Sequence, residues 1–329
     1  MNISNLSVEM RAVKYYIGMD IGGTKCAVTL ADETCRGFAA KTVFDTLTER
    51  GPGAIIDELI QSARELMDEK NLSPSDVIAC GVSCGGPLDS ERGVILGPPN
   101  LPGWDEIPLA DIVSEKLGVP CKVQNDADAC ALAEWHFGAG RGCRNMIFLT
   151  FGTGLGAGLI LGGKLYTGSG TAGEAGHIRL CESGPEGYGK AGSFEGFCSG
   201  GGIAKLGALM LAEYGGETVL KNAELTAKSI AQAANAGDEL AVKIYEKSGE
   251  MLGRGLAVLI DLLAPEKIII GSIFARSEKL LRGSMEKALK EEALAPALRK
   301  CEIVPAALGE EIGDYAAIGV AKEYGESIK

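Results

Sequence analysis

Two glycine-rich turns separate pairs of apolar runs, and both have the composition of a phosphate-binding loop. The first lies between the runs 15–20 and 26–30 and offers Asp20, Gly22, Gly23, Thr24 and Lys25. Glycine lets backbone N–H groups approach an anion, because no Cβ stands in the way. The residue order differs from that of a P-loop, in which lysine precedes serine or threonine at the start of a helix. We predict a triphosphate contact here and a water-mediated Mg²⁺ contact for Asp20, with an ordinary hairpin turn as the alternative.

The second turn repeats this chemistry between the predicted strands 146–151 and 158–161, with Gly152, Thr153 and Gly154 at its centre. Its glycines also fit a dinucleotide-binding fingerprint, with Glu174 about 20 residues further on as the ribose ligand. That fingerprint needs a helix directly after the turn. Here an apolar strand follows, and two more glycines mark a hairpin at its end. The context favours a second phosphate contact over a nicotinamide cofactor.

Asn125 and Asp126 stand between the predicted strand 121–124 and an alanine-rich helix. A carboxylate at this strand end projects toward any interdomain cleft, where Asp126 could accept the proton of a hydroxyl group during phosphoryl transfer. Aspartate is also a common helix N-cap. Both interpretations of Asp126, the base and the cap, remain open on this segment alone.

Glu174 and His177 form a further polar group in a glycine-rich stretch, and Glu195 follows. Carboxylates and imidazole can hydrogen-bond sugar hydroxyls, which display donors and acceptors in every direction. The alternatives are a structural histidine at 177 and a solvated loop charge at 195. The other histidine of the chain, His136, follows a tryptophan on an apolar helix and is interpreted as structural.

Strands that alternate with helices are expected to position these groups, a pattern typical of an α/β domain. An amphipathic helix follows Pro52, and the strand 77–83 ends at Gly85-Gly86-Pro87. The other predicted elements are the helices 108–117, 202–214, 227–236, 239–263 and 313–324 and the strand 267–270. Both halves open with a strand, a glycine turn and a strand, so we predict a duplicated domain plan without a residue-level repeat.

The composition indicates a two-domain cytoplasmic protein. A chain of 329 residues exceeds what one hydrophobic core usually organises. The formal charge of −12, from 32 basic and 44 acidic residues, argues against nucleic-acid binding. Ten cysteines without a C-x-x-C pair are typical of reduced thiols. Met1–Lys14 lacks the apolar region of a signal peptide, and no run reaches the roughly 20 apolar residues of a membrane span, so we expect no membrane partner.

Taken together, the motifs resemble the ROK family of sugar kinases, repressors and open reading frames. They are Asp20–Lys25, Asn125–Ala127, Gly152–Gly156 and Glu174–His177, with a Gly-Pro-Pro-Asn-Leu-Pro-Gly-Trp segment ending at Trp104. The resemblance implies an α/β fold, the two-domain actin-like ATPase (ribonuclease H-like) fold with an interdomain cleft. Its small domain would hold residues 1–124 and the C-terminal helix 313–329, and its large domain residues 125–312.

The resemblance also implies roles for single residues. Asp126 matches the catalytic base of the family. The implied substrate contacts are Gly86, Asn100, Asn125, Asp126, Glu174, His177 and Glu195. The implied ATP contacts are Asp20, Gly22, Gly23, Thr24, Lys25, Gly152, Thr153, Gly154 and Gly271, the last beside the adenosine. Ser272 replaces the second glycine that usually follows Gly271, so nucleotide affinity is expected to differ.

One departure concerns the structural zinc that family members commonly bind through the motif histidine and three cysteines. Glu186, Tyr188 and Ser193 occupy the cysteine positions in this chain. Because soft thiolate ligands are missing there, we expect no structural zinc. A site rebuilt from the same histidine with Cys181 and Cys198 is the alternative.

Without a metal, packing and hydrogen bonds around Tyr188, Ser193 and Phe194 would hold this loop. Some other group must then orient the His177 imidazole, and the Tyr188 hydroxyl is one candidate.

Three functions fit these residues. The first is ATP-dependent phosphorylation of a hexose, with glucose preferred and another hexose or an N-acetylhexosamine as the alternative. The second is a sugar-responsive repressor, which needs a helix-turn-helix ahead of the first turn, whereas only Met1–Met19 precede Asp20. The third is a sugar-binding module without turnover, which the intact Asp126 and both turns disfavour. We expect the kinase, with ATP and Mg²⁺ as cofactors and, by resemblance, a homodimer.

Overall fold

The structure, a computed structural model, describes residues 13–329 and divides the chain into two compact units. One unit contains the described residues up to Asn125 together with Ala316–Lys329, and the other contains Asp126–Tyr315. The sequence analysis placed the two boundaries after residues 124 and 312, and the two units divide after Asn125 and after Tyr315. The interpretation of Met1–Lys14 falls largely outside the described residues.

A five-stranded sheet in the order β3-β2-β1-β4-β7 forms the centre of the first unit. β1 (Tyr15–Ile21), β2 (Lys25–Asp32) and β3 (Phe38–Asp45) are antiparallel neighbours, and β4 (Val77–Cys84) and β7 (Cys121–Asn125) continue the sheet in parallel with β1. β4 is buried along almost its whole length, as is typical of a parallel strand that is covered on both faces.

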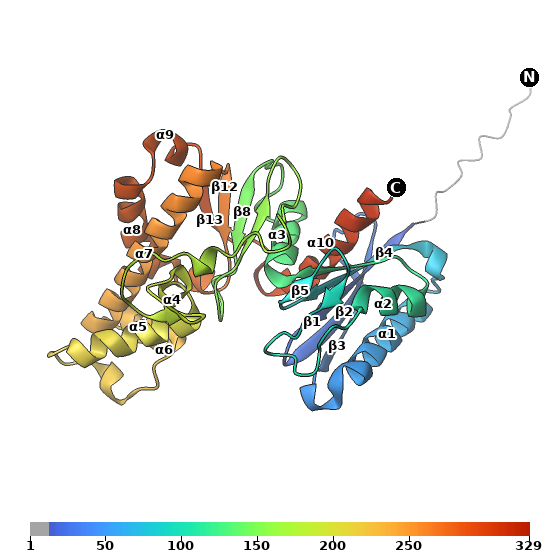
Figure 1. Cartoon of the computed structure of the whole chain (residues 1–329), viewed down its shortest axis with the longest axis horizontal. Coiled ribbons are helices and arrows are strands. Elements are labelled where there is room, and N and C mark those ends of the chain that lie inside the picture. The colour runs from blue at the N-terminus through green and yellow to red at the C-terminus, as the bar shows by residue number, and fades with distance from the viewer. Residues whose placement is uncertain (1–12) are drawn as a thin grey trace, which may run out of the picture. The chain divides into compact units, whose positions relative to one another are not determined.

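Helices cover this sheet on both sides (Figure 1). On one face, Ile17 and Met19 of β1 pack in one core with α1 (Gly51–Glu69) and α2 (Leu109–Leu117). The other face is covered by α10 (Ile312–Ser327). Gly18 and Gly81 lie so close to this helix that a Cβ on either glycine would overlap Ala317. Two strand glycines therefore let the α10 backbone approach the sheet. The short strands β5 (Leu88–Asp89) and β6 (Val94–Ile95) pair with each other.

A four-stranded sheet in the order β13-β12-β8-β9 forms the centre of the second unit. β8 (Met146–Leu149) and β9 (Ala157–Ile160) are antiparallel. β12 (Lys267–Ile270) runs parallel to β8, and β13 (Glu302–Pro305) runs parallel to β12. This unit therefore opens with a hairpin and adds parallel strands afterwards, as the first unit does, which agrees with the predicted duplicated plan.

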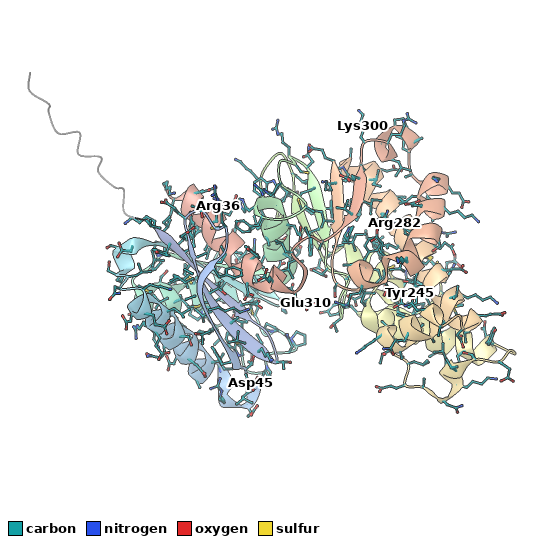
Figure 2. The ribbon with its side chains drawn as sticks, turned by 180° about the vertical axis from the view of Figure 1, so that it is seen from behind. Arg36, Asp45, Tyr245, Arg282, Lys300 and Glu310 are labelled. Carbon is teal, nitrogen blue, oxygen red and sulfur yellow. The ribbon has the colours of Figure 1, made fainter. Side chains whose placement is uncertain are left out.

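Helices make up most of the remaining second unit. They are α3 (Asp126–His136), α4 (Phe194–Phe197), α5 (Gly200–Glu213), α6 (Ala227–Asn235), α7 (Glu239–Leu263), α8 (Ile273–Glu292) and α9 (Ala295–Leu298). The Tyr245 hydroxyl donates to Ala227 O at 2.8 Å and connects α7 to α6. The Arg282 guanidinium donates to Ile303 O at 3.2 Å and connects α8 to β13. Both side chains are labelled in Figure 2. A small hairpin joins β10 (Glu186–Gly187) to β11 (Lys190–Ala191).

The elements predicted from the sequence are present, with ends shifted by a few residues. The sequence analysis missed β3, β13 and α8, and also the short elements β5, β6, β10, β11, α4 and α9. β3 is half exposed and carries no clear apolar alternation. α8 did have a signal, because Leu281, Met285 and Leu289 recur every four residues and are buried.

Within residues 13–329, no helix combines the length and the apolar character needed to cross a membrane. All ten cysteines lie in this part of the chain and are free thiols.

Candidate active site

The carboxyl ends of β1, β4 and β7 meet at one edge of the first sheet. Asp20 pairs with Ser83 and Cys84 pairs with Asn125, so the first glycine turn, the Gly85-Gly86 segment and Asn125 all leave the sheet at this edge. Ligands of open α/β sheets bind outside the carboxyl ends of the parallel strands. Three predicted groups, which lie far apart in the sequence between Asp20 and Asn125, are therefore brought together by strand register.

The first glycine turn closes on itself and presents its outer residues to solvent. Gly22 N donates to Lys25 O at 3.0 Å, and a Cβ on Gly22 would lie 2.9 Å from that oxygen. Thr24 and Lys25 are exposed, and Asp20 is partly exposed at the start of the turn. The turn thus offers an ammonium group, a hydroxyl group and a carboxylate, a donor set that fits a phosphate with its Mg²⁺.

Asn100 packs between the turn and the Gly85-Gly86 segment. A Cβ on Gly23 would lie 2.9 Å from Asn100 O, and a Cβ on Gly85 would lie 3.5 Å from Asn100 Oδ1. The Asn100 loop is anchored by the fully buried Trp104, whose carbonyl accepts from Gly97 N at 2.9 Å. Glycine at positions 23 and 85 leaves the space that Asn100 occupies.

Thr46 holds the first turn from behind, a role that the sequence analysis missed. This residue follows β3 and is completely buried. Its Oγ1 donates to Gly22 O at 2.6 Å, and its N donates to Thr24 O at 2.9 Å. The Arg50 guanidinium donates in turn to Thr46 O, at 3.1 and 3.3 Å, and forms an ion pair with Glu58. A buried threonine therefore fixes two carbonyls of the turn.

Asp126 is the first residue of α3 and follows Asn125 directly. Its Oδ1 accepts from Ala127 N at 2.8 Å. The side chain keeps an exposed surface, yet the surrounding protein desolvates it and raises the pKa of the carboxyl above its ordinary value, while the Ala127 N–H opposes that shift. Asp126 thus bonds the N–H of the next residue, whereas an N-cap side chain bonds the N–H two or three residues on. Burial moves the pKa of its carboxyl in the direction that strengthens a general base.

The second glycine turn connects the antiparallel strands β8 and β9, and no helix opens from it. Gly152 N donates to Gly154 O at 3.0 Å, and Thr150 Oγ1 accepts from Gly156 N at 2.9 Å. Beyond β9, Leu165 pairs back onto Ile160, as the predicted hairpin requires. The dinucleotide-binding alternative is excluded by this geometry, because its phosphate contact needs a helix N-terminus after the turn.

Glu195 joins the second turn to the Glu174–His177 stretch. Its Oε2 accepts from Leu155 N at 3.0 Å, and a Cβ on Gly154 would lie 2.8 Å from the same oxygen. A Cβ on Gly176 would lie 3.2 Å from Glu195 Cβ. Glu195 is therefore not a solvated loop charge. Glu174 and His177 are both exposed beside it.

Gly271 and the start of α5 also lie against the second turn. Gly200 N donates to Gly152 O at 2.7 Å, and a Cβ on Gly152 would lie 3.6 Å from Ser272 Oγ. A Cβ on Gly271 would lie 3.1 Å from the Phe148 ring, so this position has little room for a side chain. Ser272, where the family usually has glycine, has φ 52° and ψ −110°, a conformation that favours glycine. The second turn is thus surrounded by the predicted adenosine contact and by the N-terminus of α5, which the sequence analysis did not single out.

The loop that replaces the zinc motif is held by two of the three predicted residues. Ser193 and Phe194 are buried, and Ser193 Oγ accepts from Gly196 N at 3.1 Å and caps α4. Tyr188 is exposed and therefore does not pack the loop, so the predicted packing role for this residue is wrong. Its ring meets the His177 ring edge-on, with centroids 6.4 Å apart.

Neither nearby cysteine resembles a zinc ligand. Cys198 Sγ is fully buried and donates to Ser248 O at 3.5 Å, and burial raises the pKa of this thiol far above its ordinary value. Cys181 Sγ faces Met251 Sδ at 3.9 Å. Across the described residues, no three His, Cys, Asp or Glu side chains gather as metal ligands would.

Comparisons with known proteins identify the family of this chain. The model of the ROK family matches residues 16–323. A glucokinase of Thermotoga maritima is 31% identical over 313 residues, 93% of this chain and 97% of that protein. The DNA-binding transcriptional dual regulator NagC of Escherichia coli K12 is 29% identical over 92% of this chain and 74% of the regulator. The crystal structure of a ROK family glucokinase from Streptomyces griseus in complex with glucose and AMPPNP superposes with a TM-score of 0.70 and 30% identity, covering 94% of this chain and 99% of that one. The predicted fold class is confirmed by these likenesses.

Proposed function

The chain belongs to the ROK family and is a sugar kinase, and on that premise we propose that it transfers the γ-phosphoryl group of ATP to a hydroxyl of a hexose, with glucose as the preferred substrate. The observation that carries this proposal is the position of Asp126. Its carboxylate comes one residue after the carboxyl end of a parallel strand, next to Asn125, and has a raised pKa. A carboxylate of this kind can accept the proton of an attacking hydroxyl at neutral pH.

In the proposed reaction, the sugar hydroxyl oxygen forms a bond to the γ-phosphorus while its proton passes to Asp126. The bond between the γ-phosphorus and the bridging oxygen breaks, and ADP leaves. The hexose is held by the hydrogen-bonding side chains of Asn100, Asn125, Glu174, His177 and Glu195, with Gly86 beside them. ATP is held by the two glycine turns, with Gly271 near the adenosine.

Mg²⁺, when bound with ATP, offsets the charge of the phosphate oxygens. We assign Asp20 to hold this ion through water, because a partly exposed carboxylate at the start of the phosphate turn is a suitable hard ligand. Lys25 offers a second positive charge at the same turn.

Similarity to NagC supports a second candidate, a sugar-responsive regulator without turnover. Release of ADP should be measured over a panel of glucose, mannose, allose, fructose and N-acetylated hexosamines, with Asp126→Asn as the background. We expect turnover well above that background, with the highest kcat/KM for glucose. A different leading sugar would replace glucose in the proposal. Sugar binding without turnover above the Asp126→Asn background would favour the regulator.

We also propose a homodimer, on the family resemblance alone. We place it in the cytoplasm, binding neither nucleic acid nor membranes, since the charge of −12 and the ten free thiols fit such a protein. The first unit would carry the first phosphate turn, and the second unit would carry Asp126, the second turn and the adenosine contact.

A further inference from the structure

Tyr188 occupies a backbone conformation that suits other residues better. It forms, with Gly189, the two-residue turn between β10 and β11, where Gly187 pairs with Lys190. Tyr188 has φ 44° and Gly189 has φ 72°. Two-residue hairpin turns with positive φ at both central residues favour Asn-Gly, because asparagine tolerates the left-handed region and larger L-residues do so at a cost in free energy. Turn formation therefore does not explain the tyrosine.

Packing does not explain it either. The side chain is 81% exposed, the highest value among the exposed large apolar side chains of residues 13–329. The phenol ring thus contributes little buried area to the fold, while its backbone is strained. Strained residues that the fold does not need are found preferentially at functional sites.

The ring lies beside one residue of the proposed sugar site, and its hairpin packs against a second. Its centroid is 6.4 Å from that of His177, with the planes at 78°, so the edge-on contact leaves ring surface open. The base of the hairpin is fixed against the same site. Lys190 Nζ donates to His177 O at 2.8 Å, and a Cβ on Gly187 would lie 2.9 Å from Glu195 Cβ. The hairpin, whose Gly187 packs against Glu195, consequently holds the Tyr188 ring at a defined place next to His177.

We infer that Tyr188 supplies an aromatic contact to the hexose that His177 binds, an inference that rests on the proposed function. The hydroxyls of a hexose need polar partners, whereas its ring C–H groups form an apolar surface that packs well against the negative face of an aromatic ring. His177 and Glu195 provide the first kind of contact, and Tyr188 provides the second. Tyr188 is then a substrate contact that acts through its ring and not through its hydroxyl group.

The test compares Tyr188→Asn with Tyr188→Phe in the full chain. Asparagine suits the turn and removes the ring, and phenylalanine keeps the ring and removes only the hydroxyl. We expect Tyr188→Asn to raise KM for the preferred hexose about three- to tenfold, the loss typical of one aromatic contact. KM for ATP should stay within about twofold, and the melting temperature should equal or exceed that of the wild type. Tyr188→Phe should stay within about twofold of the wild type in both KM values.

Three results would overturn the inference. An unchanged hexose KM in Tyr188→Asn would show that the ring makes no contact, and equal losses in both variants would assign the effect to the hydroxyl. A clear fall in the melting temperature of Tyr188→Asn would show that the ring supports the fold. If the wild type phosphorylates no hexose, the proposed function fails instead, and calorimetric binding of glucose to the same three proteins still decides whether the ring contacts the sugar.

Discussion

Substitution of Thr46 by valine should damage the first phosphate turn while leaving the sugar contacts intact. Valine keeps the shape of threonine and removes the hydroxyl that donates to Gly22 O at 2.6 Å. A carbonyl that loses its partner inside a protein costs about 1–3 kcal/mol. Gly22 is partly exposed, so water can replace part of the bond and a loss of about 1–2 kcal/mol is expected. For a domain of this size, that corresponds to a fall in melting temperature of about 2–8 °C.

The same change should be visible in the kinetics. The backbone N–H of Thr46 still holds Thr24 O, so the turn is loosened and not lost. We expect KM for ATP to rise by up to about tenfold, the equivalent of about 1.4 kcal/mol, with KM for the hexose unchanged. ADP release measured at varied ATP and at varied hexose separates the two constants.

Thr46→Ser is the matched control, because serine keeps the hydroxyl and loses only a methyl group. It should retain most of the stability and a nearly normal KM for ATP. If Thr46→Ser were as damaged as Thr46→Val, the methyl packing and not the hydrogen bond would be responsible. A Thr46→Val protein with reduced stability and normal KM for ATP would refute a link between this bond and the phosphate contact.

Four further outcomes follow from the site. Asp126→Asn should lower kcat by about 10²-fold or more with sugar binding retained. Because burial raises the pKa of this carboxyl, its ionised form destabilises the fold at pH 7, so the variant should melt no lower than the wild type. For the same reason, the acidic limb of the wild-type kcat profile should lie above pH 3.8. A near-normal kcat would reduce Asp126 to a helix cap. Chelation by EDTA should stop turnover and added Mg²⁺ should restore it, and full activity after exhaustive chelation would contradict the account of the phosphate turns. Ser272→Gly should raise the free energy of unfolding by about 1 kcal/mol, because glycine adopts the positive φ of this position without strain. Ser272→Ala should give no such gain, and chemical denaturation measures both variants. Elemental analysis should find no stoichiometric zinc, whereas one zinc per chain that is needed for activity would point to Cys181 and Cys198 as ligands.

Local sequence was enough to find both glycine turns. Each is a run of glycines between two short apolar strands. A strand, and not a helix, follows Gly156, and this local feature alone distinguishes the second turn from a dinucleotide-binding turn. Asp126 could be located for the same reason, because the end of a strand and the start of a helix are both visible in the neighbouring residues. These features depend on backbone preferences over fewer than about ten residues, which a sequence displays directly.

Contacts between distant segments were decided only by the tertiary structure. Thr46 reaches Gly22 because Lys25 of β2 pairs with Asp45 of β3, and β3 itself has no clear pattern in the sequence. The sequence left open whether Glu195 was a sugar contact or a solvated loop charge, and folding excluded the second by placing its carboxylate on Leu155 N, forty residues away. Tyr188 was predicted to pack the loop, but the position of its hairpin beside His177 leaves the side chain exposed. Strand register and side-chain burial arise from the whole unit, so residue types identify the chemistry of this protein while only its packing determines which groups meet.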